Sequence, residues 1–209
     1  MPIRTEERQR RMRFADPWRC WAEIRRRKEF RMADLVATGA HRRSAAAFVQ
    51  RLMDAGIVAS DDRAGRNRGK FGVAVYTLVK DIGRRCPRFT SAGELNTRPT
   101  AQERMWAAMK PLRQGFFLPE LEALARIDTE NTLKSYVKAL HRAGYVEVVQ
   151  TIPHRFASRY PTHRYRLVKS KNTGPEAPVI LRDGAVWDPN LDAIVWAPEA
   201  TAEPDEVAA

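Results

Sequence analysis

The spacing of apolar residues predicts a helical face that occurs twice along the chain. Each face has apolar residues at positions i, i+3, i+4 and i+7, which is the spacing of the buried side of a helix. The first face consists of Ala45, Phe48, Val49 and Leu52. The second consists of Leu133, Tyr136, Val137 and Leu140. Glycine follows both segments, at Gly56 and Gly144, where it is typical of a helix end.

Around each face the pattern predicts two further helices and a hairpin. In the first copy, Asp16 as the N-cap and Pro17 at the first helical position start a helix that runs into the basic residues 25–28. A second helix covers residues 32–38. Gly39 forms a tight turn before the third helix, and apolar residues 57–58 and alternating residues 73–79 form the hairpin.

The second copy shows the same order of elements. Thr100 and Glu103 form a capping box at the start of its first helix. Residues 118–126 form the second helix, and Asp128 caps the third. Residues 145–150 and 164–168 pair as strands, and Phe116-Phe117 adds a short strand.

The two copies match residue for residue where the third helix ends. Leu52 to Val58 and Leu140 to Val146 share the pattern Leu-x-x-Ala-Gly-x-Val at an offset of 88. Leu35 and Leu121 match at an offset of 86, which predicts two extra residues around the second turn. This arrangement resembles the winged helix-turn-helix family. The resemblance implies a mainly α fold with small β-hairpin wings, built as two tandem winged helix-turn-helix domains.

A narrower resemblance covers the second copy and the segment that follows it. Residues 171–178, Lys-Asn-Thr-Gly-Pro-Glu-Ala-Pro, and Asp183-Gly184 are similar to small DNA-binding proteins of Mu-like transposable phages and prophages. This resemblance implies DNA binding.

Charge separates the chain into a basic body and an acidic end. Residues 1–174 hold 36 Lys and Arg against 17 Asp and Glu, whereas residues 175–209 hold 1 against 8. A basic body attracts polyanions, of which nucleic acid is the first candidate and an anionic membrane surface the second. Together with the repeat, the charges predict a basic arm (1–15), a first domain (16–80), a linker (81–99), a second domain (100–170) and an acidic tail (171–209).

Composition excludes several classes of protein. No apolar run approaches the roughly 18 residues of a membrane span. Cys20 and Cys86 are too few for a disulfide framework and favour a reducing, cytoplasmic location. The two cysteines and four histidines share no zinc-ligand spacing, so we expect no metal and no cofactor.

The sequence offers little for catalysis. Residues 65–70 resemble a phosphate-binding loop, but three residues separate the two glycines where four are required. Phe71 also stands where Ser or Thr would hold magnesium. We therefore predict that the protein is not an enzyme.

The third helix of the first copy is the leading candidate for DNA contact, because this helix of the motif enters the major groove. The apolar face leaves a second set of residues pointing outward: Arg42, Arg43, Ser44, Ala46, Ala47 and Gln50. Arg42 or Arg43 can pair with guanine, and Gln50 with adenine. The alternative is that these residues form an ordinary solvated helix face.

In the second copy the candidate contacts are fewer. They are Thr129, Asn131, Lys134 and Lys138, with Asn131 as an adenine reader and the two lysines on phosphates. Glu130 departs from a basic surface. It either accepts from cytosine or balances the helix dipole.

The hairpin loops supply further basic candidates. In the first loop they are Arg63, Arg66, Asn67, Arg68 and Lys70. In the second they are Arg155, Arg159 and Arg164. Such loops can follow phosphates or enter a narrow minor groove.

The acidic tail predicts a hairpin around Asp183-Gly184 that carries Trp187. An exposed tryptophan on so short a piece is unfavourable, so the hairpin docks either on its own body or on a protein partner through residues 175–197. The favoured function is double-stranded DNA binding by a transcriptional or phage-type regulator. The alternative is an adaptor whose winged helices or tail bind a transposition or replication component.

Overall fold

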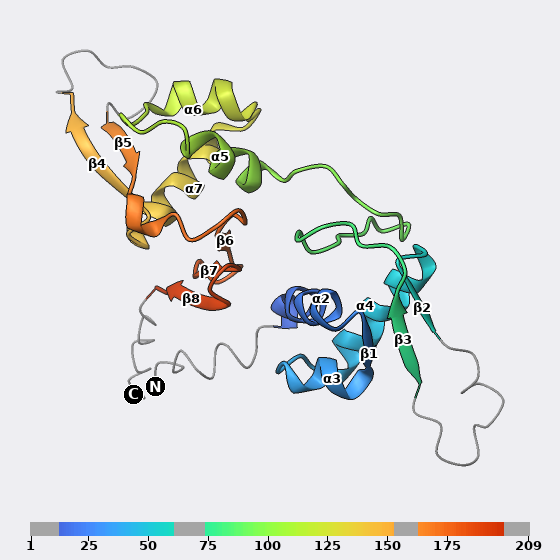
Figure 1. Ribbon diagram of the computed structural model, residues 1–209. Coiled ribbons are helices and arrows are strands. Elements are labelled where there is room, and N and C mark those ends of the chain that lie inside the picture. Colours follow the sequence, from blue (N-terminus) through green and yellow to red (C-terminus); the bar gives the residue numbers. More distant parts are fainter. Residues whose placement is uncertain (1–12, 61–73, 153–162, 199–209) are drawn as a thin grey trace, which may run out of the picture. The chain divides into compact units, whose positions relative to one another are not determined.

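The computed structural model divides the chain into two compact units (Figure 1). It describes residues 13–60, 74–152 and 163–198. The N-terminal unit ends at Arg98, and the C-terminal unit starts at Pro99.

The N-terminal unit is a helix, a helix-turn-helix and a three-stranded sheet. After a short 3-10 turn (Arg13–Ala15), its elements are α2 (Asp16–Arg27), β1 (Glu29–Arg31), α3 (Met32–Ala37), α4 (Arg42–Asp54), β2 (Val58–Ser60) and β3 (Val75–Leu78). Strand β3 is central and antiparallel to both β1 and β2. The core includes Trp21, Ile24, Leu35, Phe48 and Leu52.

The C-terminal unit repeats this order and adds a second sheet. Its elements are α5 (Ala101–Met109), α6 (Leu118–Ala125), α7 (Glu130–Arg142), β4 (Val146–Thr151), β5 (His163–Leu167), a 3-10 turn (Lys169–Lys171), β6 (Val179–Ile180), β7 (Val186–Asp188) and β8 (Ala193–Trp196). Strands β4 and β5 pair antiparallel, and β6, β7 and β8 form a separate antiparallel sheet. The predicted capping box is confirmed, because Thr100 Oγ1 accepts from the Glu103 amide.

The first strand of the N-terminal sheet has a counterpart in the C-terminal unit. Phe30 of β1 pairs with Tyr76 of β3, and their rings stack at 5.5 Å. Phe116 forms a single bridge to Tyr165 of β5, and these rings stack at 6.2 Å. The expected strand at Phe116-Phe117 is therefore reduced to one bridge.

The length difference between the copies lies in a helix and not in the turn. Helices α4 and α7 both have 13 residues. Each turn before them has the same length, at residues 38–41 and 126–129. Helix α3 has 6 residues, whereas α6 has 8. The two extra residues expected around the second turn are present, and they lengthen the end of α6 directly before the turn.

The prediction of a mainly α protein was wrong. Of the described residues, about 41% are helical and 20% are in strands, which makes the fold mixed α/β. The difference comes from strand content that the pattern did not indicate. Strand β1 has only 3 residues and pairs with a strand more than 40 positions away. The tail forms a sheet of three strands where one hairpin was expected.

Residues 81–98 pack on the N-terminal unit, although the sequence was interpreted as a linker. Cys86 is buried in that unit's core, and the Phe89 ring meets the Phe48 ring edge-on at 6.4 Å. Leu95 also packs there. The segment therefore completes the first core.

The tail docks on the C-terminal unit itself. Val186 belongs to that unit's core, and Trp187 is only 1% exposed. The Tyr136 hydroxyl donates to the Pro178 carbonyl, and the Tyr145 hydroxyl donates to Asp188 Oδ2 at 2.6 Å. Of the two docking modes expected for the tail, packing on its own body is therefore the one observed, and Trp187 is buried.

Candidate nucleic-acid interface

The start of α4 is held by a residue from α2. Asp16 is 3% exposed, and its Oδ2 accepts a hydrogen bond from the His41 amide at 3.1 Å. His41 is the residue that precedes α4, and Gly39 before it adopts a φ of +88°, which favours glycine. Asp16 was expected to cap its own helix, but Ala15 occupies that position. The Asp16 carboxylate therefore fixes the entry into α4.

Helix α4 buries the predicted face and exposes the other. Its buried residues are Ala45, Phe48, Val49 and Leu52. Its exposed residues include Arg42, Arg43, Ala46, Ala47 and Gln50, while Ser44 is half-buried. The Gln50 amide donates to Asp54 Oδ1 at 2.8 Å. An adenine contact by Gln50 would first have to break this bond.

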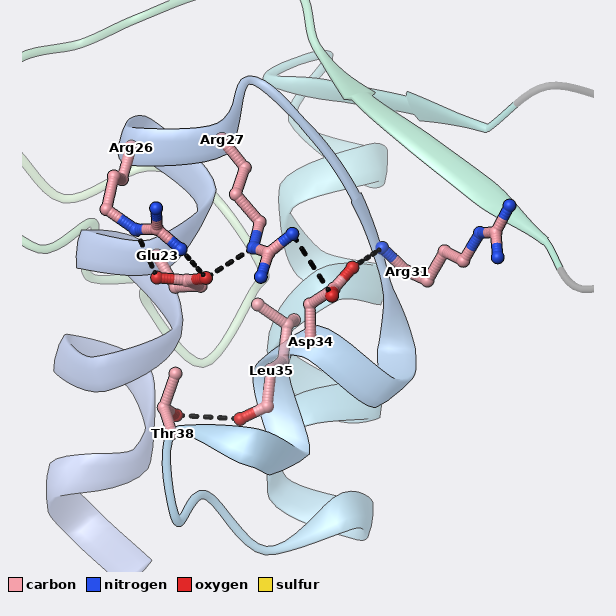
Figure 2. Close-up of polar contacts among 7 residues, drawn as sticks. All are labelled: Glu23, Arg26, Arg27, Arg31, Asp34, Leu35 and Thr38. Atoms are coloured by element: carbon pink, nitrogen blue, oxygen red, sulfur yellow. Dashed lines mark hydrogen bonds and ion pairs between the residues drawn. The ribbon is translucent and has the colours of Figure 1, made fainter.

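The basic run at the end of α2 is neutralised by carboxylates (Figure 2). Arg26 donates to both oxygens of Glu23, at 2.8 and 2.5 Å, and Arg27 pairs with the same carboxylate. Arg27 also lies 3.3 Å from Asp34, which ties α2 to α3. Hydrogen bonding from Arg26, assisted by Arg27, lowers the pKa of Glu23 to about 2.

The remaining two cations of this run share another carboxylate. Arg25 and Lys28 each lie 2.8 Å from Asp81. The hydrogen bond from Arg25, with a second from Lys28, lowers the pKa of Asp81. Each cation in residues 25–28 therefore has an acidic partner.

The cations of α4 differ from those of α2. Arg42, Arg43 and Arg51 are exposed, and within the described part of the chain their side chains form no ion pair. Arg51 was not among the sequence candidates. The sequence could have identified Arg51 as a candidate, because Arg43, Ala47 and Arg51 lie at i, i+4 and i+8 on one helix face. The unpaired positive charge of this unit's helices is therefore gathered on α4.

Helix α7 presents a less basic surface. Thr129, Asn131 and Lys138 are exposed, but Lys134 forms an ion pair with Glu130 one turn earlier. Thr129, and not Asp128, is the residue that precedes the helix. Glu130 thus compensates one of the two lysines expected to contact phosphates.

The loop candidates fall mostly outside the described residues. This holds for Arg63, Arg66, Asn67, Arg68, Lys70, Arg155 and Arg159. Arg164 is described, and its guanidinium lies 5.7 Å from the centre of the Phe117 ring. Its Nε atom is buried without a hydrogen-bond partner in the described structure. Arg164 is therefore partly engaged in packing.

Protein-family models, curated proteins and solved structures give no match to this chain. Among the described helices, none is long and apolar enough to cross a membrane. The described ranges also hold no group of three His, Cys, Asp or Glu side chains that could bind a metal ion.

Proposed function

We propose that the protein binds double-stranded DNA, with each unit acting as a winged helix-turn-helix module and α4 as the principal reading helix. One observation carries this proposal. The exposed arginines of α4 have no acidic partner among the described residues, whereas the neighbouring cations of α2 are all neutralised.

The chemistry of the α4 surface suits a major groove. Arg42 and Arg43 lie in the first turn, the end of a recognition helix that contacts base edges. Arginine binds guanine through two hydrogen bonds, each such pair being worth about 1–3 kcal/mol of discrimination. Ala46 and Ala47 have small side chains in the middle of the exposed face, so the backbone of α4 can approach the bases closely.

The C-terminal unit supplies the second contact in this proposal. Lys138 carries the phosphate contact, and Asn131 and Thr129 lie in or beside the first turn of α7. Because Lys134 is paired with Glu130, we assign α7 a smaller share of the affinity than α4. A regulatory role, transcriptional or phage-type, follows if the protein prefers particular sequences.

Fluorescence anisotropy of a labelled random duplex, measured with the full chain across a salt series, tests the proposal. Six to eight phosphate contacts predict a slope of log K against log[salt] of roughly −5 to −7. A duplex that stays unbound at low salt contradicts DNA binding. Selection of bound sequences from a random duplex pool then tests sequence preference, which would appear as an enriched motif.

A further inference from the structure

A hollow of about 620 Å³ lies in the C-terminal unit between the end of α5 and the base of the β4–β5 hairpin. Four cations line it, from two separate stretches of chain: Lys110, Arg113, Arg166 and Lys169. Glu147 is the one carboxylate in the lining. None of these residues was a DNA-contact candidate.

The single carboxylate neutralises only one of the four cations. Glu147 Oε1 accepts from the Arg166 guanidinium at 2.8 and 3.0 Å. Arg113 and Lys169 are exposed and form no ion pair within the described ranges. The hollow therefore has an excess of positive charge.

Lys110 is held in the hollow by neutral groups. Its ammonium donates to the Gly174 carbonyl at 2.7 Å and lies 5.1 Å from the centre of the Trp106 ring. Neither partner removes the charge, and burial lowers the pKa of Lys110 against the opposing effect of Glu176. An anion beside Lys110 would stabilise its charged form.

The other walls of the hollow are apolar. Met109, Leu112 and Leu167 contribute to the lining. Small-molecule sites commonly have volumes of about 300–1,000 Å³ and combine apolar walls with a few convergent polar groups. The size and the mixed lining suit a ligand that has an anionic group joined to a less polar body.

We propose that this hollow binds a small phosphorylated molecule of nucleotide size, with the phosphate held by Lys110, Arg113 and Lys169. Lysine and arginine form charge-assisted hydrogen bonds to phosphate oxygens, which are roughly twice as strong as neutral ones. The site is separate from the proposed DNA contacts on α4 and does not depend on them.

Isothermal titration calorimetry of the full chain with inorganic pyrophosphate and with ADP tests this site. We expect both probes to bind. The variant R113Q/K169Q should bind them at least about tenfold more weakly, since it loses two charge-assisted hydrogen bonds to the phosphate. Both changes are on exposed residues, so the fold should be preserved, which circular dichroism checks.

The matched control is R126Q/R182Q, which removes the same charge from exposed positions of the C-terminal unit outside the hollow. It should bind both probes like the parent, and so should R42Q/R43Q, whether or not DNA binding depends on α4. Equal losses in R113Q/K169Q and R126Q/R182Q, or no binding of either probe by the parent, overturn the proposal. The proposal is also overturned if neither small probe binds while R113Q/K169Q weakens the binding of duplex DNA. That result would assign the hollow to DNA phosphates.

Discussion

The Trp21 indole donates a hydrogen bond to the Gly83 carbonyl at 3.0 Å, and this bond joins the first helix of the N-terminal unit to the chain that follows its sheet. The same relationship occurs in the C-terminal unit, where the Trp106 indole donates to the Gly174 carbonyl at 3.2 Å. Each unit is thus closed by a tryptophan of its first helix. This correspondence extends the similarity between the two copies beyond their matched helix ends.

Replacing either tryptophan should destabilise its own unit. Trp21→Phe removes the indole donor and part of a core side chain, so we expect a loss of about 1–3 kcal/mol in the free energy of unfolding. Hydrogen exchange followed by mass spectrometry should show faster exchange in the N-terminal unit. Trp106→Phe is the matched control and should act on the C-terminal unit. Equal effects of one variant on both units would contradict this assignment.

Replacing two glycines of the C-terminal unit by alanine should lower the free energy of unfolding by different amounts. Gly115 has a φ of +92°, and a Cβ there would lie 2.6 Å from the Tyr165 carbonyl oxygen. Gly144 has a φ of +74° with nothing within 4 Å of a Cβ. We expect Gly144→Ala to cost about 1–2 kcal/mol from backbone strain, and Gly115→Ala clearly more because the clash adds to it. Urea unfolding measures both, and equal costs would contradict the close contact at Gly115.

The Glu23 ion pairs predict a loss of stability in acid. Because the folded pKa of Glu23 is lowered to about 2, its contribution is present above the unfolded pKa of about 4.3 and is lost as pH falls towards 2. Glu23→Gln should cost about 0.5–1 kcal/mol at neutral pH and almost nothing near pH 2. Thermal unfolding at the two pH values measures this difference. Glu29→Gln is the control, since Glu29 is exposed and has no ion pair in the described part of the chain. A cost for Glu23→Gln that is independent of pH would count against the ion pairs.

The docked tail should depend on a buried carboxylate. Asp188 is fully buried and accepts hydrogen bonds from the Tyr145 hydroxyl, the Thr173 hydroxyl and the Asn190 amide. Asp188→Asn replaces one acceptor oxygen by a donor, so we expect a cost of about 1–3 kcal/mol. Limited proteolysis should then cleave the tail faster.

The control for this change is Asp192→Asn. Asp192 is exposed with a φ of +48°, a conformation that Asn tolerates well. Tail cleavage at the same rate in both variants would show that Asp188 does not hold the tail.

The sequence predicted those features that depend on neighbouring residues. The apolar spacing of Ala45, Phe48, Val49 and Leu52 identified the buried face of α4 because helical periodicity is local. The capping box of Thr100 and Glu103 was found for the same reason. The outward orientation of Arg42 and Arg43 followed from the buried face, whereas their contact with DNA stays a prediction.

Features that depend on distant pairing could not be predicted in this way. Strand β1 alternates exposed and buried residues over only 3 positions, and it exists because β3 pairs with it. Asp16 is a residue type that commonly caps a helix, but its carboxylate accepts a hydrogen bond from the His41 amide, 25 positions away. The pairing of Arg25 and Lys28 with Asp81 is also long-range, so the sequence could not show that these cations are neutralised while those of α4 are not.

The affinity of R42Q/R43Q for duplex DNA tests the central claim most directly, with R26Q/R182Q as a control that removes the same charge. Arg26 is paired with Glu23, and Arg182 lies in the turn between β6 and β7. Fluorescence anisotropy at one fixed salt concentration should show R42Q/R43Q binding at least about tenfold more weakly than the parent, and the control changing about twofold or less. Equal losses in the two variants would contradict a DNA interface centred on α4.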